Sequence, residues 1–186
     1  MLALTSCDGT GPTDRTDASW LRASLSGPAD PTFEGTGAFD TGSDPHRGVS
    51  VKWTLNSEST GATQGRTLML YRQGEGRPER GTYPLTLVDQ SNGKARGFTA
   101  FYTQVRGDTA EAFAARSGVV EITRSTEDRV EGTFRFVGVR YSARSMSGRG
   151  GEVSGDPTNP TGPMIEVSGE FSASRANDGL LTRKRE

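Results

Sequence analysis

Residues 165–173 read IEVSGEFSA, and apolar and polar side chains alternate through the whole stretch. Residues 49–56, which read VSVKWTLN, alternate in the same way. Alternation with period two is typical of a β-strand that buries one face and exposes the other. Both stretches therefore predict half-buried strands of an antiparallel sheet.

The same pattern recurs along the rest of the chain, between clusters of turn-forming residues spaced about ten residues apart. The further candidate strands are Trp20–Ser26, Phe33–Asp40, Thr67–Arg72, Thr82–Leu87, Gly97–Val105, Gly118–Thr123 and Arg129–Tyr141. We therefore expect an all-β fold, either a single antiparallel β-sandwich or a flattened β-barrel of about nine strands, with a flexible N-terminal tether.

Three local features refine this expectation. Pro84 cannot donate a ladder hydrogen bond, which predicts that its strand lies at an edge of the sheet. The apolar phase changes within Arg129–Tyr141, which predicts a bulge near Phe136–Gly138. The residues Asp108–Ala115 begin with the spacing of a capping box, so they are a candidate for one short helix.

Composition limits the classes of function that the chain can serve. Its 186 residues, of which 31% are hydrophobic, suit one ordinary domain with a core. The 22 basic and 23 acidic residues leave a net charge of −1, so no bulk field attracts nucleic acid, and we expect no nucleic-acid partner. No apolar run is long enough to predict a membrane-spanning helix.

Cysteine and histidine each occur once, as Cys7 and His46. Disulfides, zinc centres and triads with a histidine base need more of these residues, so they are not expected. His46 lies in a turn composition, which favours a solvated loop residue. The stretch Asp40–Asp44 resembles the first half of a calcium loop but lacks the distal glutamate, so a plain turn is expected. We therefore expect no metal and no cofactor.

The N-terminal stretch Leu4-Thr5-Ser6-Cys7 resembles the lipobox of bacterial lipoproteins. The resemblance implies cleavage between Ser6 and Cys7, lipid attachment at Cys7, and a cell-envelope protein anchored to a membrane whose leaflet stays open. Only a few residues precede the motif, so a complete signal peptide would need a start codon further upstream. The alternative is a cytosolic protein in which the motif occurs by chance.

This resemblance divides the chain into four parts. Residues 1–6 are expected to be the remnant of a signal peptide. Residues 7–18 hold the lipidated cysteine and a polar linker, residues 19–174 form the β-domain, and residues 175–186 are a flexible basic tail. The long break 142–162 is rich in Ser, Gly, Arg and Pro, which favours disorder.

A second resemblance lies in the strand region. Gly118–Thr123 followed by Val130–Phe136 is similar to a motif of uncharacterised bacterial lipoproteins, in which a G-x-V-x-I-T strand precedes V-x-G-T-F-x-F. The likeness extends to Gly81–Tyr83 and to Gly169–Phe171. It implies an anchored β-domain of unknown role, and it transfers no catalytic residue to this chain.

The first hypothesis for function is a non-enzymatic binding or structural β-domain that presents loops to an envelope protein or a glycan. Glycan binding would need exposed aromatic side chains, whereas Trp20 and Trp53 are expected in the core. A second hypothesis is a lipocalin-like carrier of a small apolar ligand.

The third hypothesis is a hydrolase that uses a pair of carboxylates, because that chemistry needs neither cysteine nor histidine. Such a pair would come from the strand glutamates, although each alternates with apolar neighbours and is therefore expected on the solvent face. The arginines that lie close together in sequence are assigned no site, because arginine is spread along the whole chain. The glutamates are Glu121, Glu131, Glu166 and Glu170, and the arginines are Arg135, Arg140 and Arg144.

Overall fold

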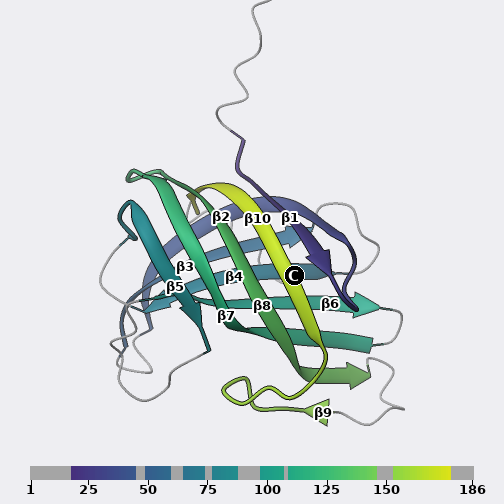
Figure 1. Cartoon of the computed structure of the whole chain (residues 1–186). Coiled ribbons are helices and arrows are strands. Elements are labelled where there is room, and N and C mark those ends of the chain that lie inside the picture. The colour runs from purple at the N-terminus through teal and green to yellow at the C-terminus, as the bar shows by residue number, and fades with distance from the viewer. Residues whose placement is uncertain are drawn as a thin grey trace, which may run out of the picture.

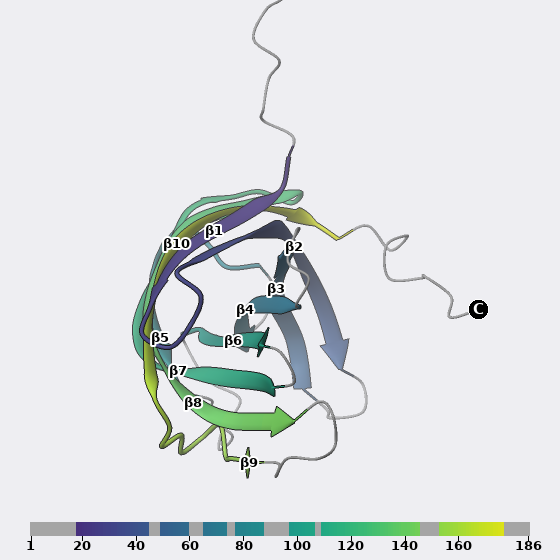
Figure 2. The same ribbon diagram turned by 90° about the vertical axis from the view of Figure 1, so that its right-hand side faces the viewer.

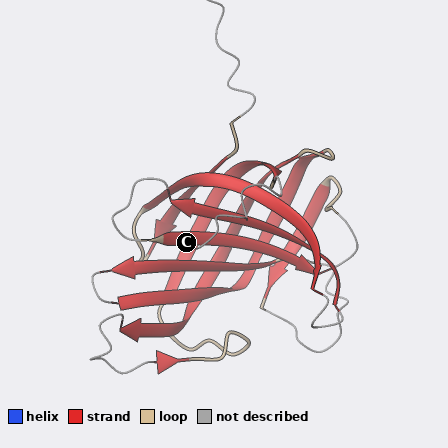
Figure 3. Ribbon diagram, turned by 180° about the vertical axis from the view of Figure 1, so that it is seen from behind, coloured by secondary structure: helices blue, strands red, loops and turns tan. Residues whose placement is uncertain are grey.

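The computed structural model describes residues 18–44, 49–59, 65–73, 77–87, 97–106, 109–145 and 153–176. Within these ranges the fold is all-β and contains no helix, as the strand colouring of Figure 3 shows. The strands belong to one sheet (Figure 1). The expected all-β class is therefore confirmed.

Within the described residues the sheet contains ten strands, against an expectation of about nine. The smallest, β9, has two residues and lies within the long break for which disorder was predicted. The strands are β1 (Trp20–Ser26), β2 (Thr32–Asp44), β3 (Val49–Ser59), β4 (Arg66–Gln73), β5 (Gly81–Thr86), β6 (Thr99–Arg106), β7 (Thr109–Ser125), β8 (Arg129–Ser145), β9 (Val153–Ser154) and β10 (Met164–Arg175).

The sheet is curled and mixed. Its strand order is β5-β7-β6-β4-β3-β2-β1-β10-β8-β9, and β7 also pairs with β8. The neighbours are antiparallel except at the end of β10, where Ser174 and Arg175 run parallel to β2. Viewed from the front, β1, β10 and β8 cross over β4 and β6, and the side view shows the curved profile of the sheet (Figures 1 and 2).

The long strands β7 and β8 pair with each other, and β7 changes its other neighbour along its length. The first part of β7 pairs with β6, and its second part pairs with β5. Between these parts Arg116 is left without a partner in the register with β8, opposite the step from Val137 to Gly138. A bulge is therefore present beside Phe136–Gly138, where one was predicted, but its extra residue lies on β7 instead of β8. A bulge of this kind bends a strand and increases its twist.

The core fills the space inside the curl. Strand β1 illustrates the alternation that builds this core: Leu21, Ala23 and Leu25 are buried, and the residues between them are exposed. The aromatic rings of Phe33 and Tyr102 meet edge to face, with 6.3 Å between their centroids. The largest fully buried side chains are Tyr102, Phe33, Phe39, Phe98, Phe113 and Phe171.

Two glycines lie directly opposite phenylalanines in the pairing of β8 with β10. Gly169 faces Phe134, and Gly132 faces Phe171. A Cβ atom on Gly169 would lie 2.7 Å from Phe134 Cζ, and one on Gly132 would lie 3.1 Å from Phe171 Cζ. The glycines thus leave the space that each ring occupies across the neighbouring strand.

Two local expectations have opposite outcomes. Strand β5, which contains Pro84, pairs with β7 alone among the named strands and stands at one end of the strand order, so the edge position is confirmed. The candidate helix at Asp108–Ala115 is wrong, because β7 begins at Thr109 and pairs with β6 and β8 through this region. The sheet offers Phe113 a fully buried position, which outweighs the local helix signal.

Other expectations concern turns and loops. The turn expected at Asp40–Asp44 is instead the end of β2, with a register shift between Gly42 and Asp44. Part of the break for which disorder was predicted lies along β8: the backbone N–H of Gly162 donates to the carbonyl of Arg140 at 3.0 Å. The residues 1–17 and 177–186, which include the expected anchor and most of the basic tail, lie outside the described residues.

Candidate functional site

The outward side chains of β1, β10, β8 and β7 form four rows across neighbouring strands, and we call this surface the outer face. Each row follows from the strand register. In the order β1, β10, β8, β7 the rows are Trp20–Ser172–Glu131–Arg124, Arg22–Glu170–Thr133–Glu121, Ser24–Ser168–Arg135–Val119 and Ser26–Glu166–Val137–Ser117.

All four strand glutamates lie on the outer face. Glu121, Glu166 and Glu170 are exposed, and Glu131 is half-buried. The expected solvent-facing position is therefore confirmed, and none of the four points into the core. A hydrolase built on an inward pair of these carboxylates has no support in this arrangement.

Trp20 is not in the core, contrary to the expectation. Its side chain is half-buried and lies on the outer face, where the Arg22 guanidinium carbon is 5.4 Å from the centre of its ring. The physical reason is its phase: Trp20 alternates with the buried Leu21, so it shares a face with Arg22 and Ser24. The side chain of Trp53 lies outside the described residues.

A hollow of about 350 Å³ opens beside Trp20, and we call it the Trp20 hollow. Polar and apolar surface line it in about equal parts. Its lining residues come from the ends of β1, β7, β8 and β10, which the register brings to one level. The lining residues are Trp20, Thr123, Arg124, Arg129, Glu131, Gly132, Thr133, Glu170, Phe171 and Ser172.

Hydrogen bonds and an ion pair link the polar groups of the Trp20 hollow. The Ser172 hydroxyl donates to Glu131 Oε1 at 3.3 Å and accepts from Arg129 Nη1 at 3.3 Å. Arg124 Nη1 lies 3.6 Å from the same Glu131 oxygen. The carboxylate thus contacts one guanidinium group and one hydroxyl, and a second guanidinium group donates to that hydroxyl.

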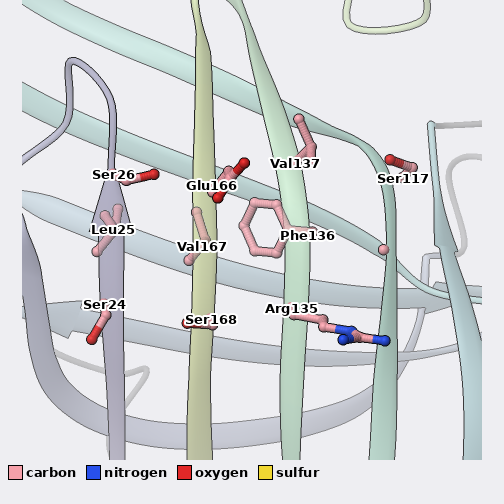
Figure 4. A pocket seen from close by; sticks show the side chains of 11 residues that line it. Ser24, Leu25, Ser26, Ser117, Arg135, Phe136, Val137, Glu166, Val167 and Ser168 are labelled. Atoms are coloured by element: carbon pink, nitrogen blue, oxygen red, sulfur yellow. The ribbon is translucent and has the colours of Figure 1, made fainter.

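Three further hollows lie on the outer face. One of them, of about 470 Å³, is lined from β1, β10, β8 and β7 and contains Glu166 and Arg135 (Figure 4). We call it the Glu166 hollow. The other two lie between it and the Trp20 hollow, around Ser168 and Gly169. All lining residues of these hollows belong to strands that are neighbours in the sheet, so the hollows are on its surface and not in its interior.

A separate polar network lies inside the curl, on β6, β7 and β8. The fully buried Gln104 donates from Nε2 to Glu111 Oε2 at 2.9 Å, and Arg140 Nη1 donates to Glu111 Oε1 at 2.6 Å. The Tyr102 hydroxyl donates to Gln104 Oε1 at 3.3 Å. Each buried polar group of this network therefore has a partner.

Two groups of the network have shifted pKa values. Burial acts to raise the pKa of the Glu111 carboxyl, but hydrogen bonds from Gln104 and Arg140 and the charges of Arg140 and Arg106 lower it below its ordinary value. Burial raises the pKa of the Tyr102 hydroxyl to about 12, against the opposing charge of Arg66. Glu111 is thus held as a carboxylate and Tyr102 as a neutral donor.

The shift at Tyr102 predicts lower stability at alkaline pH. Between the ordinary pKa of 10.0 and the folded value of about 12, the unfolded chain releases a proton that the folded chain keeps. The free energy of unfolding should therefore fall by about 1.4 kcal/mol per pH unit in this window. Urea unfolding at a series of pH values above neutral measures the slope.

The variant Tyr102→Phe is the control for this slope. It lacks the hydroxyl that titrates, so its alkaline slope should be shallower. A part of the slope should persist, because burial also raises the pKa of Tyr141. An unchanged slope in Tyr102→Phe would contradict the assignment.

The arginines close together in sequence do not form one cluster. Arg135 is exposed on the outer face, Arg140 reaches Glu111, and the side chain of Arg144 lies outside the described residues. Within the described ranges, no three His, Cys, Asp or Glu side chains converge as metal ligands would. Cys7 and His46 also lie outside these ranges.

Comparison with known proteins adds no family. No protein-family model, curated protein or solved structure matches the chain. In the part of the chain that the structure describes, no helix is long and apolar enough to cross a membrane. The resemblance to bacterial lipoproteins therefore stays a prediction.

Proposed function

We propose that this protein is a non-enzymatic binding module of the bacterial cell envelope, which binds a glycan on its outer face and is anchored by a lipid at Cys7. The observation that carries the glycan proposal is the Trp20 hollow. There an aromatic ring stands beside a linked set of carboxylate and guanidinium groups.

The chemistry of a sugar fits this combination. A sugar ring has an apolar C–H face, which can pack on the flat indole of Trp20, and a rim of hydroxyls that both donate and accept hydrogen bonds. The Glu131 carboxylate accepts and the Arg124 guanidinium donates, and charge-assisted bonds of this kind are stronger than neutral ones. Because their mutual contacts already orient them, little conformational entropy is lost on binding.

The rest of the fold supports binding outside the sheet rather than inside it. We propose that the β7–β8 pairing closes the curled sheet as a flattened barrel around the core. Buried rings such as Tyr102 and Phe113, with centroids 6.1 Å apart, fill positions that a carrier would leave for its ligand. The interior thus favours a stable scaffold over a lipocalin-like carrier.

A lipid anchor at Cys7 would limit the distance between the outer face and the membrane. Eleven residues, 8–18, would separate the lipidated cysteine from the β-domain, and they span at most about 40 Å when extended. Trp20 follows directly at the start of β1. Thirteen residue steps separate Cys7 from Trp20, so a lipid at Cys7 would hold the Trp20 hollow within about 47 Å of the membrane surface.

The glycan proposal predicts a large effect of Trp20→Ala on binding. The full chain, titrated with oligosaccharides of neutral hexoses and of N-acetylated amino sugars, should bind at least one of the two classes in isothermal calorimetry. Trp20→Ala should weaken this binding by about tenfold or more, because the apolar platform is lost.

Met164→Ala is the matched control, since it removes an exposed apolar side chain that lies away from the hollow. It should leave the affinity unchanged. Absence of binding to both sugar classes, or equal affinities for Trp20→Ala and the wild type, would overturn the proposal.

The anchor is tested separately by mass. The gene, expressed with its upstream in-frame codons, should give a membrane-extracted product whose intact mass corresponds to cleavage before Cys7 plus a diacylglyceryl group. An unmodified protein that begins at Met1 would overturn the anchor and leave the glycan proposal standing.

A further inference from the structure

We infer that the ligand of the outer face is an unbranched polysaccharide that runs along β10, with Trp20 at one end of its path and Glu166 and Arg135 at the other. This inference rests on the proposed glycan binding. It adds the form of the ligand, its direction and a second subsite.

The hollows of the outer face join into one furrow. The Trp20 hollow shares Glu170 with one of the two hollows in the middle and Thr133 with the other. The middle hollows in turn share Ser168 with the Glu166 hollow, and one of them also shares Arg135 with it. A ligand can therefore pass from one end to the other without leaving the surface.

The furrow is longer than a single sugar. Its ends are marked on β10 by Ser172, beside Trp20, and by Glu166, which lies six residues earlier in the chain. At the rise of an antiparallel strand these six steps span about 20 Å. Only a chain of several sugar rings reaches from one hollow to the other.

The far end offers unused polar groups. Glu166 and Arg135 project from the neighbouring strands β10 and β8 (Figure 4), and both are exposed. Within the described ranges neither makes a hydrogen bond or an ion pair that holds it in place. One accepts and the other donates hydrogen bonds, so together they can bind the hydroxyl or amide groups of a sugar.

The two ends of the furrow therefore offer a ligand different contacts. At the Trp20 end a ring packs on an aromatic surface beside oriented charges. At the Glu166 end, serines on β1 and β10 such as Ser26 and Ser168 leave space between the longer side chains. Most of the lining surface there is apolar, and Glu166 and Arg135 supply the charged groups. A short ligand would occupy the Trp20 end first, and each added ring would extend it toward Glu166.

The test is a length series of one oligosaccharide, from a disaccharide upward, titrated against the full chain. In the wild type the affinity should rise with length until the furrow is filled. In Arg135→Ala the longest oligosaccharides should bind about tenfold more weakly, whereas the disaccharide should bind as in the wild type. Trp20→Ala should weaken binding at every length.

Arg80→Ala is the charge-matched control, because Arg80 is exposed and lines none of the four hollows. It should bind the whole series as the wild type does. An affinity that does not change with length, or an Arg135→Ala effect that is equal for short and long ligands, would overturn the furrow and leave glycan binding intact. Failure of every oligosaccharide to bind would overturn both.

Discussion

Glu111→Ala should lower the free energy of unfolding by about 3 kcal/mol, because it removes the centre of the buried network. Glu111 accepts hydrogen bonds from Gln104 at 2.9 Å and from Arg140 at 2.6 Å, and its own side chain is 12% exposed. Without it, a fully buried amide and a partly buried guanidinium lose their partner. Urea unfolding at neutral pH measures the loss.

Glu121→Ala on the same strand is the matched control. Glu121 is exposed on the outer face, so its removal should change the stability by less than about 0.5 kcal/mol. Equal losses in the two variants would contradict a structural role for the network.

The network also predicts how the free energy of unfolding changes at acid pH. Because the pKa of Glu111 is lowered in the folded chain, its contribution is present above the ordinary value of 4.5 and is lost as the pH falls toward the folded value. The difference in stability between the wild type and Glu111→Ala should therefore shrink on acidification below this value.

Gly169→Ala should destabilise the fold by about 2 kcal/mol or more. A Cβ atom at this position would lie 2.3 Å from the carbonyl oxygen of Arg22 and 2.7 Å from Phe134 Cζ. The first of these atoms belongs to the backbone of β1, so the clash is relieved only if neighbouring strands move apart. Thermal unfolding followed by circular dichroism measures the effect.

Gly65→Ala is the control for chain flexibility, because a Cβ there meets no atom within 4 Å. Its melting temperature should stay close to that of the wild type. A Gly169→Ala variant as stable as Gly65→Ala would show that the strands adapt and that Phe134 does not need the space.

The sequence predicts the strands well because alternation is a local property that the sheet preserves. The same rule places Trp20 in the phase of Arg22 and Ser24, so the expectation of a buried Trp20 assigned the wrong phase of this strand to the core. The wrong helix at Asp108–Ala115 has another cause. Its capping-box signal is local, whereas the pairing that overrides it comes from β6 and β8.

The candidate site is less predictable, because it depends on register between strands that are distant in sequence. Ser172 and Glu131 are 41 residues apart along the chain, and only the pairing of β10 with β8 brings them together. The same holds for Trp20 and Ser172, which pair across β1 and β10. No spacing along the sequence marks these contacts.

The pairing of β7 with β8 also affects how the protein behaves among its own copies. An open sheet ends in rows of unpaired backbone groups, which invite strands of other molecules and lead to aggregation. Here the strands that end the order are β5, with Pro84 in its middle, and β9, with two residues. Neither offers a long template, so the fold protects itself against edge-to-edge association even at high local concentration.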